Sequence, residues 1–271
     1  MRGRITRKRF AIIGILLLCG TAMQARAATI TVTNTNDSGA GSLRQALAIA
    51  NNGDTINFAV TGTITLTSGG LMIDKNVTIS GPGANQLSID GYQGDFVLGV
   101  DPDKTAAIAG LTIRNGQVGI GNVGALTVSN CAISGNSYGG LSNVANGQTA
   151  TNATLTIANS IVSNNSGPGV SNAAFKGSAT LTIVNSTLTG NSVGAGEPGG
   201  GIYTFGLDGA AYVTVTNSTI SGNSADGGGG VFSNSSSVII VNSSVRCWRS
   251  EFYAAAVPRP TRPLLLSRIR S

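Results

Sequence analysis

The chain has 271 residues, a formal net charge of +6, no histidine and 39 glycines, and only 10% of its residues are charged. The lack of histidine excludes Ser-His-Asp and Cys-His nucleophile sites and imidazole metal ligands. The hydrophobic content of 41% excludes a disordered polyelectrolyte, so the composition predicts an ordered chain with many turns.

Residues 1–27 have the features of a secretory signal peptide. A basic segment precedes an apolar run from Phe10 to Leu18, which is too short to span a bilayer. The small residues that follow predict cleavage between Ala27 and Ala28. We therefore expect export by general secretion and a mature chain without a transmembrane segment. The alternatives are an uncleaved anchor, a twin-arginine signal and a lipoprotein signal, and the residues fit each of these less well.

The next region, residues 28–58, contains the one clear helix signal after the leader. Ser42 and Gln45 have the spacing of a capping box, and apolar residues follow at helical spacing from Leu43 to Ala50. Asn51-Asn52-Gly53 then ends the run. Short strands punctuated by glycine are expected after it, at residues 54–58, 63–66, 71–73, 77–79 and 87–89.

Five copies of the pattern Leu/Val-x-Ile/Val-x-Asn fill the middle of the chain, and their asparagines lie 25 to 32 residues apart. Two further short apolar segments follow each copy, so each repeat holds three strands. The alternation in Leu181-Thr182-Ile183 places Leu181 and Ile183 on one side, which only stacked repeats can bury. The sequence therefore predicts an all-β parallel β-helix, or solenoid, over residues 59–245, with residues 28–58 as its cap. The expected inner ladder is Leu126, Leu155, Leu181, Val213 and Val238.

A second asparagine recurs in the repeats, at Asn136, Asn165, Asn191 and Asn223. We interpret it as a turn amide that adopts left-handed backbone geometry and hydrogen-bonds to the next coil. Glycosylation sites or ligand contacts are the alternatives.

Residues 246–271 break the repeat pattern. They contain six arginines and the only tryptophan, and Val245 is the last residue in register. We interpret them as an out-of-register basic tail, produced by a frameshift or truncation; a natural cap or a basic ligand are the alternatives. The leader and this tail carry the positive charge, whereas residues 28–245 have five basic and ten acidic side chains. The folded part is therefore mildly acidic, and nucleic acid is not an expected partner.

Three segments of the cap and first coils, Asn36–Ala46, Gly53–Ile56 and Ile79–Ala84, resemble the start of secreted bacterial right-handed parallel β-helix proteins of the CSLREA type. The repeats are similar to those of polymorphic outer-membrane proteins and autotransporter passengers, although that motif usually has Phe where this chain has Ile, Leu or Val. The resemblance implies a right-handed β-helix outside a bacterial cell or on its surface or outer membrane. It implies no common catalytic set.

An acidic cluster is the first candidate site. It comprises Asp90, Asp95, Asp101 and Asp103, with Arg114 one segment further on. In a β-helix lyase such a cluster would bind Ca²⁺ beside an arginine base, with Asp101 and Asp103 as ligands. Solvated loops are the alternative, because the segment after Asp103 lacks the later ligands of a calcium loop.

An aromatic patch is the second candidate site. Tyr203 and Phe232 are expected to point outward on adjacent coils, with Phe205 and Asp208 nearby. Stacked aromatic rings beside a carboxylate would bind a sugar, whereas a local patch that covers a loop insertion is the alternative.

No catalytic constellation recurs in the repeats, so the sequence predicts a non-enzymatic chain. We expect a secreted or cell-surface shaft, monomeric and without a cofactor, that adheres to a host or cell surface or contacts extracellular polysaccharide. The alternatives are a polysaccharide lyase or hydrolase on the same fold, and a truncated fragment of a longer surface protein without a function of its own.

Overall fold

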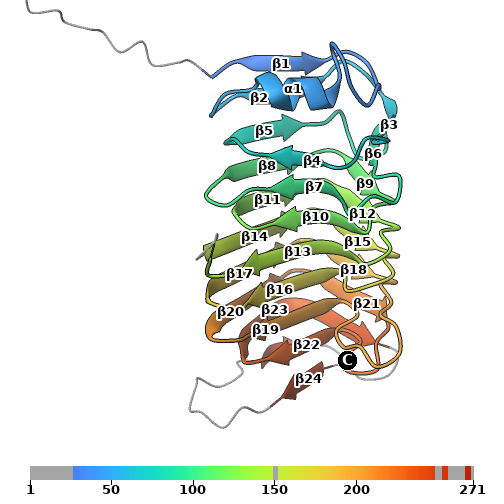
Figure 1. Ribbon diagram of the computed structural model, residues 1–271. Coiled ribbons are helices and arrows are strands. Elements are labelled where there is room, and N and C mark those ends of the chain that lie inside the picture. Colours follow the sequence, from blue (N-terminus) through green and yellow to red (C-terminus); the bar gives the residue numbers. More distant parts are fainter. Residues whose placement is uncertain (1–26, 149–151, 248–251, 256–265, 270–271) are drawn as a thin grey trace, which may run out of the picture.

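The computed structural model describes residues 27–148, 152–247, 252–255 and 266–269. The chain winds into a right-handed parallel β-helix whose strands stack on three faces, which we name A, B and C (Figure 1). Every pairing recorded among the described strands is parallel, and a typical coil contributes one strand to each face. The predicted fold class is thus confirmed.

Faces A and B together form a 17-stranded sheet, and face C forms an 8-stranded one. Face A consists of β1 (Thr29–Val32), β2 (Thr55–Phe58), β5 (Val77–Ser80), β8 (Thr105–Ala109), β11 (Ala125–Ser129), β14 (Asn152–Ala158), β17 (Gly177–Val184), β20 (Gly209–Thr216), β23 (Ser236–Cys247) and β25 (Leu266–Ile269). Face B consists of β3 (Gly62–Thr65), β6 (Leu87–Asp90), β9 (Thr112–Arg114), β12 (Ala132–Ser134), β15 (Ile161–Ser163), β18 (Thr187–Thr189) and β21 (Thr219–Asn223). Face C consists of β4 (Leu71–Ile73), β7 (Phe96–Val100), β10 (Val118–Asn122), β13 (Gly139–Ala145), β16 (Val170–Ala174), β19 (Ile202–Gly206), β22 (Val231–Asn234) and β24 (Phe252–Ala255).

The core is a set of aliphatic ladders inside this tube. The predicted ladder from Leu126 to Val238 runs along face A, and each of its members is at most 4% exposed. Full burial of one such side chain contributes roughly 1.5 to 3 kcal/mol. A register shift of one residue would turn these side chains outward, so the ladder fixes how the coils stack.

The recurring asparagines form a buried ladder in the turns between faces B and C. The Nδ2 group of Asn136 donates to Oδ1 of Asn165 at 2.9 Å, and the same bond joins Asn165 to Asn191 at 2.8 Å and Asn191 to Asn223 at 2.9 Å. The predicted bond to the next coil is therefore confirmed. The predicted left-handed geometry is wrong for these residues, because positive φ is found instead at the asparagines that end the face A strands. Those are Asn130, Asn159, Asn185, Asn217 and Asn242, with φ between 48° and 52°.

A serine column lies beside those left-handed asparagines. The backbone N–H of Ser160 donates to Oγ of Ser186 at 3.1 Å, and that of Ser186 donates to Oγ of Ser218 at 3.1 Å. Cys131 occupies the same position one coil earlier, and its N–H donates to Oγ of Ser160 at 3.1 Å. Burial raises the pKa of the Cys131 thiol, so this cysteine is a structural residue of the column.

The predicted capping helix is α1 (Leu43–Ile49), which contacts β1 and β4. The Ser42 hydroxyl accepts a hydrogen bond from the Gln45 N–H at 3.2 Å, as the capping box requires. Arg44 then joins the helix to the loop before β4. It donates to the Gly69 carbonyl at 2.6 Å, and its ion-pair partner Asp37, at 2.6 Å, accepts a hydrogen bond from the Ser68 N–H at 2.8 Å. These contacts give the motif around Asn36–Ala46 a structural role.

Backbone pairing extends beyond Val245. Arg246 and Cys247 pair with β21, β24 pairs with β22, and β25 (Leu266–Ile269) pairs with β23. The origin of residues 246–271 by frameshift or truncation stays a prediction. The leader lies outside the described residues, so its cleavage also stays a prediction.

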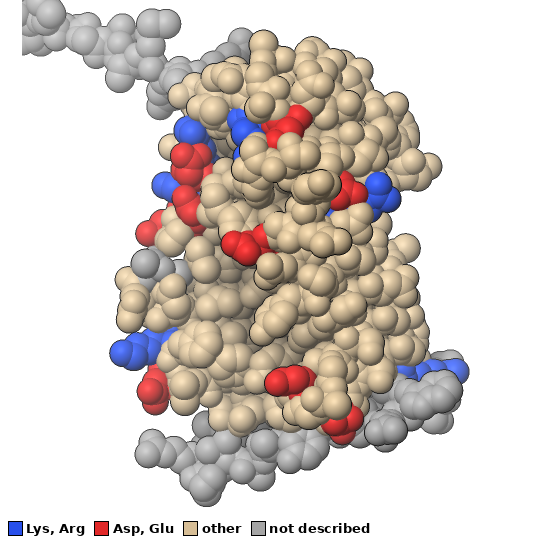
Figure 2. Space-filling view, turned by 45° about the vertical axis from the view of Figure 1, so that its right-hand side comes forward, with Lys and Arg blue, Asp and Glu red and all other residues tan. Residues whose placement is uncertain are grey.

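Charged side chains are spread unevenly over the stack. Residues 59–125 contain eight of them, whereas the longer segment 126–245 contains four. Figure 2 shows the same imbalance, with most red and blue atoms over the upper coils. Charged side chains that could take part in binding or catalysis are therefore concentrated in the upper coils.

Candidate functional site

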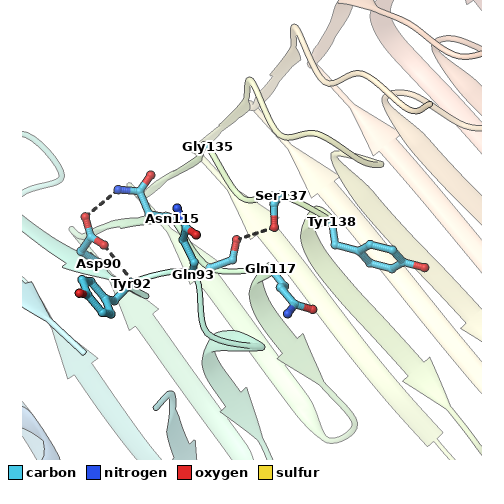
Figure 3. Close-up of a pocket in the computed structure, with 9 residues that line it drawn as sticks. Asp90, Tyr92, Gln93, Asn115, Gln117, Gly135, Ser137 and Tyr138 are labelled. Atoms are coloured by element: carbon cyan, nitrogen blue, oxygen red, sulfur yellow. Dashed lines mark hydrogen bonds between the residues drawn. The ribbon is translucent and has the colours of Figure 1, made fainter. Parts of the chain in front are cut away.

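A surface pocket of about 720 Å³ lies at the lower end of these charged coils and extends into the first coil after residue 125, where three successive turns connect face B to face C (Figure 3). Its lining is polar and aromatic, with one carboxylate. The lining residues are Asp90, Tyr92, Gln93, Asn115, Gly116, Gln117, Gly135, Ser137 and Tyr138. We call it the Asp90 pocket.

The pocket begins where the asparagine ladder ends. The N–H of Gly116 donates to Oδ1 of Asn136 at 3.0 Å, so Gly116 holds the place of the next ladder asparagine. A Cβ atom at Gly116 would lie 2.8 Å from Cγ2 of Val97, which fills the space below the turn. An asparagine side chain therefore does not fit at position 116, and the asparagine ladder ends at Asn136.

The first of these turns is strained. Tyr92 and Gln93 are consecutive residues with φ of 49° and 62°, and Asn115 in the next turn has φ of 57°. Left-handed backbone costs an ordinary residue roughly 1 to 2 kcal/mol, and such strain concentrates at functional sites. One result is that the Tyr92 side chain is displayed on the surface, at 66% exposure.

Two tyrosines stand at opposite ends of the pocket (Figure 3). Tyr138 is 75% exposed, and nothing in the regular coil requires an aromatic side chain at that position. Each phenol presents an apolar ring together with a hydroxyl that can donate and accept hydrogen bonds.

Asp90 anchors the turn from inside the pocket. Its carboxylate accepts hydrogen bonds from the Tyr92 N–H at 3.1 Å and from Nδ2 of Asn115 at 2.7 Å (Figure 3). Nε of Arg114 lies 3.3 Å from the same carboxylate, close enough for an ion pair but not aligned as a hydrogen bond. Asp95, at the end of the same turn, accepts a bond from Nε2 of Gln117 at 3.3 Å. Two carboxylates thus adjoin the pocket.

The predicted acidic cluster is divided by this arrangement. Asp90, Asp95 and Arg114 lie at or beside the pocket, whereas Asp101 and Asp103 lie in the turn that connects face C to face A. The described residues contain no group of three or more His, Cys, Asp or Glu side chains placed to hold a metal ion. The calcium site at Asp101 and Asp103 stays a prediction.

The predicted aromatic residues do meet. The rings of Tyr203 and Phe232 stack with centroids 5.5 Å apart, and Phe205 lies 5.2 Å from Tyr203. Phe175, which the sequence pattern did not single out, completes the cluster at 5.1 Å from Phe205. Asp208 lies in the turn between β19 and β20 with φ of 55°. Sugar binding at these residues stays a prediction.

The repeat pattern of the sequence does not point to the tyrosines, amides and Ser137 of the pocket. Two signals could have pointed to them. The turn after Asp90 is longer than the one after Arg114, and Gly116 replaces the ladder asparagine.

No protein-family model matches the chain, and no curated protein matches it. Solved structures share its fold. A chain titled "Geobacillus virus E2 - ORF18" matches with a TM-score of 0.48 and 11% identity, over 82% of this chain and 58% of that one. The pectate lyase Pel9A matches with a TM-score of 0.41 and 13% identity, over 84% of this chain and 78% of that one. The alginate lyase from Paenibacillus sp. str. FPU-7 matches with a TM-score of 0.40 and 13% identity, over 82% and 98%.

These matches concern the fold, yet they correct one expectation. The prediction of a non-enzymatic chain is wrong as it was made, because the structures with this architecture include two lyases. Within the part of the chain that the structure describes, no helix has the length and apolar character needed to cross a membrane.

Proposed function

We propose that this chain is a secreted bacterial β-helix protein that binds an extracellular polysaccharide in the Asp90 pocket. The observation that carries the proposal is the pocket itself, where two exposed tyrosines stand at opposite ends of a row of amide and hydroxyl groups. Sugar rings offer an apolar face and many hydroxyls, so they match aromatic rings beside hydrogen-bonding side chains. The predicted leader and the resemblance to surface β-helix proteins support a location outside the cell or on its surface.

The pocket is open at the side of a long stack, which suits a polymer better than a small molecule. A polymer chain that enters between Tyr92 and Tyr138 can continue along the coils at either end, because the turns between faces B and C stack along one edge of the β-helix. Small-molecule sites instead enclose most of the ligand surface.

Affinity electrophoresis of the protein against a panel of soluble polysaccharides tests this proposal. We expect at least one polysaccharide to retard the wild-type protein, and Tyr92→Ala with Tyr138→Ala to abolish the retardation without lowering the melting temperature. Retardation that survives in the double variant would contradict the pocket as the site. Failure of the whole panel would contradict the function.

Cleavage of the bound polysaccharide is the second candidate function. Its basis is the pair of carboxylates at the two ends of one turn, Asp90 and Asp95. Glycoside hydrolysis uses two carboxyl groups that flank the scissile bond, one as an acid and one as a base or nucleophile. The test is release of new reducing ends, lost in both Asp90→Asn and Asp95→Asn. Unsaturated products would point to β-elimination instead, and intact polymer after long incubation would exclude cleavage.

The aromatic cluster of Phe175, Tyr203, Phe205 and Phe232, with Asp208 nearby, is proposed as a second contact for the same polymer. The cluster begins one coil below the pocket's last turn, at Phe175 after β16, and extends to Phe232 in β22, three coils below, so a chain must run along the coils to reach all of it. Tyr203→Ala together with Phe232→Ala is expected to weaken binding of long chains and to leave binding of short oligosaccharides unchanged. Equal binding of long chains by both proteins would remove this surface from the proposal.

A further inference from the structure

We infer that the polysaccharide bound by the Asp90 pocket is electrically neutral, built from sugars without carboxylate or sulfate groups. This inference rests on the proposed function and names its ligand class. Its basis is the net negative charge of the pocket and the pairing of the one neighbouring cation, Arg114, with Asp90.

The charge of the pocket disfavours an anionic polymer. Asp90 is the only formally charged residue among the lining residues, and Asp95 adjoins the lining through Gln117. Arg114 is the cation beside them, and it lies in the ion pair with Asp90. The group of three is therefore net negative, and each carboxylate of a bound polyuronate would meet a carboxylate of the protein.

Three donors of the lining already bond to the protein. Nδ2 of Asn115 donates to Asp90 at 2.7 Å, Nε2 of Gln117 donates to Asp95 at 3.3 Å, and the Ser137 hydroxyl donates to the Gly116 carbonyl at 3.5 Å. Each of these two amides keeps its oxygen and its second N–H for a ligand. In Figure 3 the oxygen of Asn115 faces away from Asp90.

The groups left for a ligand are thus both donors and acceptors, and none is an unpaired cation. Carboxylate and amide oxygens accept hydrogen bonds from sugar hydroxyls, and the remaining amide N–H groups donate to sugar oxygens. The tyrosines at the two ends add ring faces and hydroxyls that serve any sugar. Hydroxyl-rich neutral glycans match this set, whereas an acidic glycan would bring its carboxylates close to Asp90 and Asp95.

The experiment compares two panels on the full-length protein. Neutral polymers (β-glucan, galactomannan, unsubstituted xylan) and acidic polymers (polygalacturonate, alginate) are titrated by isothermal calorimetry at low and at high salt, each with Ca²⁺ and with EDTA. We expect a neutral polymer to bind, with an affinity that changes less than twofold between low and high salt. We expect the acidic polymers to bind at least tenfold more weakly, with Ca²⁺ and with EDTA.

Two variants sharpen the comparison. Asp90→Asn keeps the side-chain shape and removes the negative charge, so binding of acidic polymers should rise relative to neutral ones. Asp226→Asn, at an exposed carboxylate in the lower coils and outside both proposed contacts, is the matched control and should change neither. Tighter binding of an acidic polymer by the wild-type protein would overturn the inference and leave polysaccharide binding intact. Binding of neither panel would overturn the proposed function and this inference with it.

Discussion

The upper coils, residues 59–125, and the lower coils, residues 126–245, are built from the same three-strand unit but differ in how their turns are held. In the lower coils the turns repeat, and buried asparagine and serine ladders join each coil to the next. In the upper coils those ladders stop, the turns change length, and charged side chains gather (Figure 2).

This difference separates two roles that one fold can carry. A repeated turn satisfies its buried polar groups by bonding to an identical turn, so it stabilises the stack and presents little chemistry. An irregular turn gives up that arrangement, and at Tyr92 and Gln93 it also holds strained backbone. The Asp90 pocket lies where the regular stack ends, which is why we assign function to it.

The largest expected effect comes from breaking the asparagine ladder. Asn165→Ala leaves the N–H and Nδ2 of Asn136 without their acceptor, and both groups are buried. Each unsatisfied buried donor costs about 1 to 3 kcal/mol, so we expect a loss on the order of 3 kcal/mol in the free energy of unfolding, measured in urea. The control is Asn164→Gly. Asn164, which precedes Asn165, is exposed and has φ of 55°, so a glycine at position 164 should leave the free energy of unfolding nearly unchanged. Equal effects of the two variants would argue against the ladder.

A smaller effect on the free energy of unfolding is expected at the Asp90 pocket, where a substitution should weaken binding instead. Tyr138→Ala removes a 75% exposed ring that packs against little of the protein, so the melting temperature should stay within about 1 °C while polysaccharide affinity falls tenfold or more, or about 1.4 kcal/mol. Tyr212→Ala, a 48% exposed tyrosine on face A, is the matched control for a lost surface ring. A large loss of stability in Tyr138→Ala would mean that the pocket is structural.

The cap should add a pH dependence of its own. Burial raises the pKa of Asp37, but hydrogen bonds from Ser68 and Arg44 outweigh burial and bring the pKa to about 2. The native state thus holds the charged form more strongly than the unfolded chain does. The stabilisation is present in full above the unfolded pKa, near 3.9, and is lost as pH falls toward 2. Asp37→Asn should flatten the unfolding profile between about pH 4 and pH 2; an unchanged slope in this variant would contradict the assignment.

The smallest effect is expected at Cys131, the cysteine that takes the place of a serine in the serine column. Cys131→Ser places there the residue found at Ser160 and Ser186, so the free energy of unfolding should change by less than about 0.5 kcal/mol. A loss above 2 kcal/mol by chemical denaturation would show that the thiol has a role that the serines do not share.

Much of the fold could be predicted from the sequence because it depends on periodicity. The alternation around Leu181 predicted the buried ladder, and Ser42 with Gln45 predicted the cap of α1. Spacing does not report backbone dihedral angles, however. The left-handed geometry was therefore assigned to Asn136 and its equivalents, whereas Asn130 and its equivalents adopt it.

The pocket could not be predicted in the same way. Tyr92, Asn115 and Tyr138 lie in three different coils, and their meeting depends on the paths of turns that differ in length. A repeat pattern describes what the coils share, so it is silent where they differ. The aromatic cluster was easier to predict, because Tyr203 and Phe232 occupy the same register position on adjacent strands.

Hydrogen-exchange mass spectrometry of the protein, alone and saturated with the polysaccharide it binds, tests the central claim most directly. We predict slower exchange in three turns that are far apart in the sequence, residues 91–95, 115–117 and 135–138, with the later turns between faces B and C unchanged. Protection confined to the coils after residue 138, or spread evenly along the stack, would contradict the Asp90 pocket as the functional site.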